Sequence, residues 1–187
     1  MLVCNDKGLE CLPEITEEDL TEIHCHNNQL ISLPESICNL SRLRILQCTN
    51  NQIRDLPESI CNLSNLQRLY LGYNHLVNIP DSICHLSGLQ ELFIHHNYLR
   101  ILPDSLGKLM GLQVVNCSNN QLIKLPESII ALKKCRRYFH YNENPITYVY
   151  PDFLDFERAI VNRLKRQINY QTILDTDVIS VIFGFLY

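Results

Sequence analysis

Hydrophobic positions recur along most of the chain with a period of 23 residues. In residues 43–65, LRILQCTNNQIRDLPESICNLSN, apolar side chains stand at positions 1, 4, 6, 11, 14, 18 and 21 of the unit. Position 9 is asparagine and position 15 is proline in five successive units: Asn28, Asn51, Asn74, Asn97 and Asn120, with Pro34, Pro57, Pro80, Pro103 and Pro126. A fixed period of this length indicates a stack of similar supersecondary units.

Each unit predicts one short strand and one short helical turn. Apolar positions 4 and 6 alternate with polar neighbours, as in a strand, whereas apolar residues three apart over positions 15–22 indicate a helical or 3₁₀ turn. The strand is too short to stand alone, and every connection returns the chain to the same side. We therefore expect it to pair in parallel with the same strand of the next unit. The asparagine is expected to turn inward and satisfy backbone groups there, and the proline fixes φ where the chain leaves for the back.

The ends of the repeat region depart from this pattern. Residues 2–19 form a shortened unit, residues 20–134 hold the regular 23-residue units, and residues 135–150 form an irregular last unit. In that last unit Asn144 follows Asn120 by 24 residues. Atypical terminal units are expected because they cover the exposed ends of a repeat core.

The pattern L-x-x-L-x-L-x-x-N-x-L-x-x-L-P-x-x-I-x-x-L resembles a leucine-rich repeat. The LPESI and LPDSI blocks resemble the intracellular subclass of Ras-suppressor-like and plant Ras-group-related proteins. The resemblance covers residues 2–150 and implies an α/β solenoid: a right-handed horseshoe with a concave parallel β-sheet. It also implies binding of a protein partner on the concave face.

Composition narrows the classes of partner and compartment. The net charge of −4 argues against a nucleic-acid partner, which needs a dominant basic face. No apolar run reaches the roughly 18 residues of a membrane span, and the N-terminus does not resemble a secretory signal. We therefore expect an intracellular, cytoplasmic protein whose nine cysteines are reduced thiols.

Catalytic and metal-binding patterns are weak in the sequence. It contains no phosphate-cradling glycine loop, nucleophile elbow or carboxylate dyad, so we predict neither an enzyme nor a cofactor. A zinc site would need His26 or His75 beside the adjacent His95 and His96, whose side chains diverge. No Cys-x-x-Cys pair supports such a site, so no metal is predicted.

A candidate partner site emerges from the positions that face the concave side, which are 3, 5, 7 and 8. Aromatic and histidine side chains gather there in units three and four, and position 10 adds His75 and Tyr98 at the rim. Large amphipathic side chains are frequent interface hot spots. The alternative is that stacked aromatic rings stabilise neighbouring strands. The predicted partner-binding residues are Arg68, Tyr70, Tyr73, Glu91, Phe93, His95, His96 and Tyr98.

After Pro151 the period stops. Residues 151–170 predict an amphipathic helix, with Phe156, Ile160, Leu164 and Ile168 at four-residue steps, which would cap the last repeat. Residues 171–187 predict a second helix that is apolar nearly all round and must be buried, either against the first helix or in a dimer.

The second helix also carries a resemblance. The run Leu174-Asp175-x-Asp177-Val178-Ile179-x-x-Ile182-Phe183-x-x-Leu186 resembles the opening helix of an F-box, in the truncated form of poxvirus ankyrin-repeat proteins. The sequence thus leaves two functions open. One is a non-enzymatic scaffold that binds a protein on its concave face. The other is a substrate adaptor for a cullin-type ubiquitin ligase, for which the resemblance implies docking to the ligase adaptor through Val178, Ile179, Ile182, Phe183 and Leu186.

Overall fold

The computed structural model describes residues 1–13, 15, 19–132, 135 and 138–147. Residues Met1–Val149 form one compact unit. The predicted helices at 151–170 and 171–187 lie outside the described residues. The predicted tail-docking residues Val178, Ile179, Ile182, Phe183 and Leu186 lie outside them as well.

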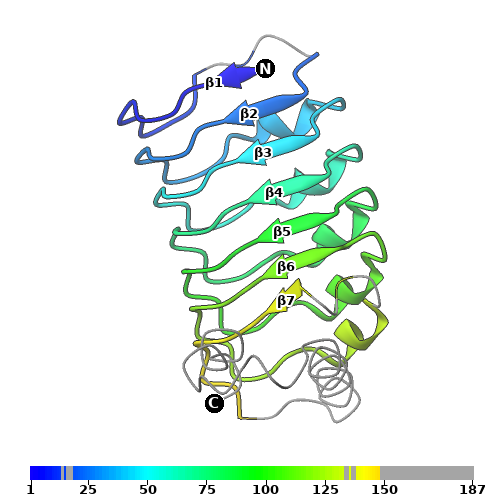
Figure 1. Cartoon of the computed structure of the whole chain (residues 1–187). Coiled ribbons are helices and arrows are strands. Elements are labelled where there is room, and N and C mark those ends of the chain that lie inside the picture. The colour runs from blue at the N-terminus through cyan, green and yellow to red at the C-terminus, as the bar shows by residue number, and fades with distance from the viewer. Residues whose placement is uncertain (14, 16–18, 133–134, 136–137, 148–187) are drawn as a thin grey trace, which may run out of the picture. The chain divides into compact units, whose positions relative to one another are not determined.

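The described part of the chain builds one parallel sheet whose strands follow one another in chain order (Figure 1). The register steps by one repeat at a time, so that Gln47 pairs with Tyr70 and Tyr70 with Phe93. This confirms the parallel pairing of equivalent strands. The strands are β1 (Leu2–Val3), β2 (Glu22–His24), β3 (Ile45–Gln47), β4 (Arg68–Tyr70), β5 (Glu91–Phe93), β6 (Val114–Asn116) and β7 (Phe139–His140).

Short 3₁₀ helices stack behind the sheet, each beginning directly after the repeat proline (Figure 1). Pro57, for example, has φ −64°, and its carbonyl accepts the Ile60 N–H at 3.0 Å. The third helical residue, such as Ile60, is buried and anchors the turn to the core. Within the described residues these helices are η1 (Glu35–Asn39), η2 (Glu58–Asn62), η3 (Asp81–His85), η4 (Asp104–Lys108) and η5 (Glu127–Ala131).

The core lies between the sheet and the 3₁₀ helices and is formed by the predicted apolar positions. Leu46 at position 4, Cys48 at position 6 and Ile53 at position 11 are completely buried, as are their counterparts in neighbouring units. Burial of this periodic set in every regular unit supplies the main favourable free energy of the stack.

The repeat asparagine joins neighbouring units, as predicted. Asn51 donates from Nδ2 to the Cys25 and Cys48 carbonyl oxygens, both at 3.0 Å, and its Oδ1 accepts the Leu30 N–H at 3.0 Å. In the irregular last unit Asn144 makes the same contacts, including a 2.9 Å bond from the Leu122 N–H. The extra residue of that unit therefore lies before the asparagine and does not disturb its contacts.

Position 8 differs from its predicted place on the strand face. Each strand of a regular unit ends at position 5, and the residue at position 8 turns the chain with a left-handed backbone conformation. Asparagine tolerates this conformation better than other non-glycine residues because its short polar side chain can bond locally. The residues concerned, with φ between 51° and 58°, are Asp6, Asn27, Asn50, Tyr73, His96, Asn119 and Glu143.

Candidate functional site

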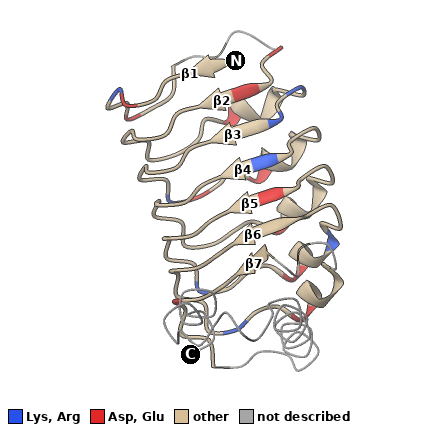
Figure 2. Ribbon diagram, in the orientation of Figure 1, with Lys and Arg blue, Asp and Glu red and all other residues tan. Residues whose placement is uncertain are grey.

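Strands β4 and β5 bring four of the predicted partner-binding residues together on the solvent side of the sheet. The Tyr70 hydroxyl donates to the Glu91 carboxylate, whose other oxygen lies 3.2 Å from Arg68 Nε. The Tyr70 and Phe93 rings meet edge to face with centroids 5.2 Å apart. Figure 2 shows a basic residue on β4 next to an acidic residue on β5. These are Arg68 and Glu91, which are direct partners in the strand register. They therefore neutralise each other within the site.

Tyr70 is held as a neutral hydrogen-bond donor. Burial, followed by the hydrogen bond to Glu91 and its negative charge, raises the pKa of Tyr70 to about 12. The nearby Arg68 opposes this shift. The phenol proton therefore stays in place at physiological pH and ties β4 to β5 through their side chains.

The left-handed turns after β4 and β5 carry the next two predicted residues. Tyr73 and His96 stack face to face, with centroids 4.2 Å apart and ring planes 9° from parallel. Tyr73 is 50% exposed, and His96 is exposed as well. Three of the neighbouring units carry asparagine at the same left-handed position. The pair thus presents flat ring surface to solvent where three other units present a small amide.

His95 lies between the strand and the turn, and Gly72 makes room for it. Its ring meets Tyr73 at 5.3 Å and Phe93 at 6.1 Å, both edge to face. A Cβ atom added to Gly72 would come within 2.3 Å of His95 Cε1. Burial lowers the pKa of His95, and the neighbouring His96 lowers it further. The imidazole is therefore neutral at physiological pH.

Tyr98 extends the ring surface around the rim, where it lies 5.7 Å from His75. His75 was not among the predicted site residues, although its place at position 10 beside Tyr98 was a usable signal. Gly72 was also missed; the signal was a glycine at position 7 next to the histidine of the following unit. We name the seven rings Tyr70, Tyr73, His75, Phe93, His95, His96 and Tyr98 the aromatic cluster.

Comparison with known proteins agrees with this architecture. Residues 19–101 match a family model described as a leucine-rich repeat region. The fold is a leucine-rich-repeat solenoid. No curated protein sequence is significantly similar to the chain.

Solved leucine-rich-repeat structures resemble the solenoid closely. A leucine-rich-repeat protein of Leptospira interrogans is 32% identical with a TM-score of 0.67, covering 78% of this chain and 36% of its own. The ectodomain of a plant membrane receptor kinase from Arabidopsis thaliana, solved in complex with Casparian strip integrity factor 2, is 32% identical with a TM-score of 0.61. That match covers 67% of this chain and 16% of the ectodomain.

An internalin of Listeria monocytogenes shows the same fold at 23% identity and a TM-score of 0.61, covering 68% of this chain and 36% of its own. This chain thus spans between 16% and 36% of the length of these three proteins. Such folds typically serve as non-enzymatic interaction scaffolds.

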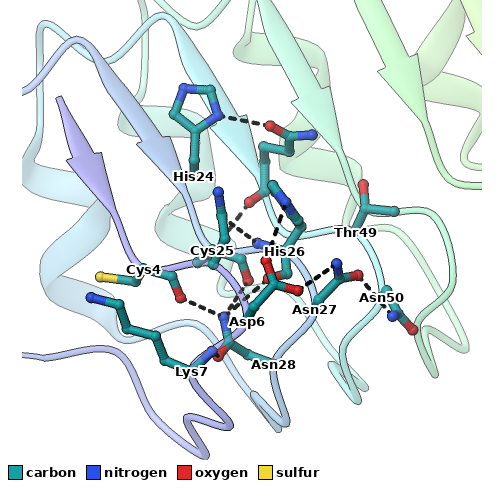
Figure 3. A network of polar contacts seen from close by, with 12 residues as sticks. Cys4, Asp6, Lys7, His24, Cys25, His26, Asn27, Asn28, Thr49 and Asn50 are labelled. Atoms are coloured by element: carbon teal, nitrogen blue, oxygen red, sulfur yellow. Dashed lines mark hydrogen bonds and ion pairs between the residues drawn. The ribbon is translucent and has the colours of Figure 1, made fainter.

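The first units of the solenoid contrast with the aromatic cluster. Side-chain hydrogen bonds join their left-handed turns. Asn27 Nδ2 donates to Asp6 Oδ1 at 2.9 Å, and Asn50 Nδ2 donates to Asn27 Oδ1 at 2.8 Å (Figure 3). On the strand face His24 contacts Gln47 at 2.7 Å and Glu22 at 3.0 Å. These contacts, with Glu22 first, raise the pKa of His24. These polar groups are satisfied within the protein, although the nearby His26 Nδ1 is buried without a partner among the described residues.

Neither a metal centre nor a membrane span is found in the described part of the solenoid. No three or more His, Cys, Asp or Glu side chains among the described residues are arranged to hold a metal ion. Those residues also include no helix with the length and apolar character needed to cross a bilayer.

Proposed function

We propose that the protein is a non-enzymatic interaction scaffold that binds a protein partner through the aromatic cluster and the flanking Arg68–Glu91 pair. The observation that carries this proposal is the replacement of asparagine by Tyr73 and His96 at two successive left-handed positions. Seven of the eight partner-binding residues predicted from the sequence are linked by ring, hydrogen-bond or ion-pair contacts, and Tyr98 pairs with His75 two residues after the Tyr73–His96 stack.

Tyr73 and His96 gain little net stability at these positions, which favours a role in binding. A left-handed backbone costs a side-chain-bearing residue roughly 1–2 kcal/mol, so two such residues cost about 2–4 kcal/mol. Their ring contacts, with each other and with His95, return about 0.5–1.5 kcal/mol each and so roughly balance this cost. The left-handed turn recurs in the other units, so the ring-bearing residues placed there, and not the backbone conformation, distinguish this surface.

The surface also has the composition of an interface centre. Exposed aromatic rings on a rigid scaffold give large contact area with little loss of side-chain entropy. The Arabidopsis ectodomain supports a binding function, since it was solved in complex with Casparian strip integrity factor 2. We therefore propose that the partner binds on the sheet side of the solenoid, which is the side predicted to be concave.

The double variant Tyr73→Asn with His96→Asn tests this function. It restores the residue type of Asn27, Asn50 and Asn119, so the lower backbone cost offsets the lost ring contacts. We expect the free energy of unfolding to stay within about 1 kcal/mol of the wild type. We expect the same variant to lose the protein partners that the wild-type chain captures from lysate, as measured by quantitative mass spectrometry.

Tyr138→Asn is the matched control, because Tyr138 is 51% exposed but lies outside the aromatic cluster. It should capture partners as the wild type does. If the double variant is folded and captures the same proteins in the same amounts, the aromatic cluster is not the partner site. If the double variant is instead clearly destabilised, the rings serve the stability of the sheet.

A further inference from the structure

Resting on the proposed function, we infer that the partner segment seated on the aromatic cluster is an uncharged, proline-rich stretch in the polyproline II conformation. Three properties of the surface specify this chemistry: paired charges, exposed flat rings and unused hydrogen-bond donors.

The charges beside the aromatic cluster are already matched. Arg68 Nε lies 3.2 Å from Glu91 Oε1, and the other Glu91 oxygen accepts the Tyr70 hydroxyl. A charged segment would have to break this arrangement or be desolvated without an opposite charge, either of which is unfavourable. Charge complementarity therefore selects a segment that carries no charge where it meets the rings.

The rings offer flat surface of the kind on which pyrrolidine rings pack. Tyr73 and Tyr98 are 50% and 49% exposed, although both belong to ring pairs on the protein surface. Proline-rich segments are recognised by aromatic surfaces because the polyproline II helix is preformed and loses little entropy on binding. An ordinary flexible apolar segment would lose more conformational entropy for the same contact.

Unused donors lie among these rings. His95 Nδ1 is buried without a hydrogen-bond partner among the described residues, so we assign the ring proton to Nε2. The Tyr73 and Tyr98 hydroxyls likewise form no hydrogen bond within the part of the chain that the structure describes. A polyproline II segment needs such donors, because its carbonyl groups have no internal partners and it contributes few N–H groups of its own.

Position and chemistry together give His95 a specific role. The ring is held between Tyr73 and Phe93, with its Nδ1–Cε1–Nε2 edge over Gly72. Of the two ring nitrogens only Nδ1 is buried without a partner among the described residues, so the Nε2–H is the donor left to a ligand. A backbone carbonyl of the bound segment is the acceptor that matches it. His95 is thus the specificity-determining residue, whereas Tyr73, His96 and Tyr98 provide the packing surface.

A nuclear magnetic resonance titration of the ¹⁵N-labelled full chain with a proline decapeptide tests this inference. We expect shifts confined to residues 68–75 and 91–98, with a dissociation constant of about 0.1–1 mM. Control peptides of the same length alternate glycine with serine, proline with glutamate, or proline with lysine. We expect each control to bind more weakly than polyproline.

Two variants separate packing from hydrogen bonding. Tyr73→Asn with His96→Asn should abolish the peptide-induced shifts, because it removes the stacked rings. His95→Phe keeps a ring but removes the donor, and should weaken the peptide by about tenfold. Unchanged peptide affinity in His95→Phe would overturn the role given to His95.

The outcomes distinguish this inference from the proposed function. Three results would overturn the inference that the bound segment is proline-rich. They are the absence of shifts at about 2 mM polyproline, equal shifts with the glycine–serine peptide, and tighter binding of a charged peptide. If the double variant nevertheless loses its captured protein partners, the proposed function stands with a partner of different chemistry. If capture survives in the double variant, the proposed function itself fails.

Discussion

The His95 imidazole occupies space that exists only because Gly72 has no side chain. Its Nδ1 is enclosed without a partner within the described residues, and protonation there would create a buried, unpaired N–H donor. The lowered pKa of His95 follows from this enclosure and from the neighbouring His96. His95, which we propose to serve binding, therefore lowers the stability of the fold in acid.

The pH dependence of stability tests this property of His95. Its pKa in the folded protein lies below the ordinary value of 6.5, so the unfolded chain binds the proton first as the pH falls. Its stability contribution is full above about pH 6.5 and is lost as the pH falls below that value toward the folded pKa. We expect His95→Phe to gain thermal stability relative to the wild type between about pH 8 and pH 5.

The measurement is the difference in melting temperature between His95→Phe and the wild type at each pH. Each pair is compared in one buffer, so the opposite contribution of His24, whose pKa is raised by Glu22, cancels between the two proteins. A difference that stays constant across this range would show that the folded protein does not resist protonation of His95.

At the scale of the elements, the strand alone does not hold one unit to the next. Regular strands are three residues long, and the repeat asparagine continues the bonding after they end. Asn74 donates to the Cys48, Leu71 and Gly72 carbonyl oxygens at 2.9, 3.1 and 3.3 Å, and accepts the Ile53 N–H at 3.0 Å. One buried amide thus satisfies backbone groups from two successive units.

Asn74→Ala should therefore be far more damaging than loss of one amide suggests. It leaves buried carbonyl and N–H groups unpaired, and we expect the free energy of unfolding to fall by about 3 kcal/mol. The matched control is Asn65→Ala, which removes a single exposed bond to the Ser41 carbonyl and should cost about 0.5 kcal/mol. Urea unfolding of both variants measures the contrast, and equal losses would rule out this role of the amide.

The sequence predicted those elements that depend on residues recurring in every regular unit. Pro57 and Asn51 act through the backbone of their own and adjacent units, so the period alone predicted the 3₁₀ helices and the asparagine bonds. The left-handed turns had a signal that went unused, the asparagines at 27, 50 and 119. The contacts of Tyr70 with Glu91 and of His95 with Gly72 depend on side-chain rotamers across strands, which spacing does not specify.

At the scale of the whole molecule, the thiols report on the integrity of the stack. All nine cysteines are free. Cys11 is exposed, Cys61 and Cys84 are partly accessible, and the others are buried in the core. Burial raises the pKa of Cys135 to about 12 and also raises that of Cys117. Enclosure and suppressed ionisation both slow reaction of the core thiols.

Thiol titration with Ellman's reagent should therefore proceed in two steps. We expect Cys11, Cys61 and Cys84 to react in the native protein and the six buried thiols to react only on unfolding, giving nine in all. The same titration in denaturant is the control for the total. Rapid reaction of all nine thiols under native conditions would mean that the core is open.

Equivalent residues lie beside one another at every step of the sheet, and the aromatic cluster lies wholly within residues 66–111. Those 46 residues comprise two whole repeats, which meet their neighbours through the same asparagine and strand contacts as any other repeat. Duplicating or deleting a whole repeat elsewhere would therefore move these two repeats along the stack without changing the rings that they present. Deleting either of the two would remove at once all the rings of the aromatic cluster that it carries.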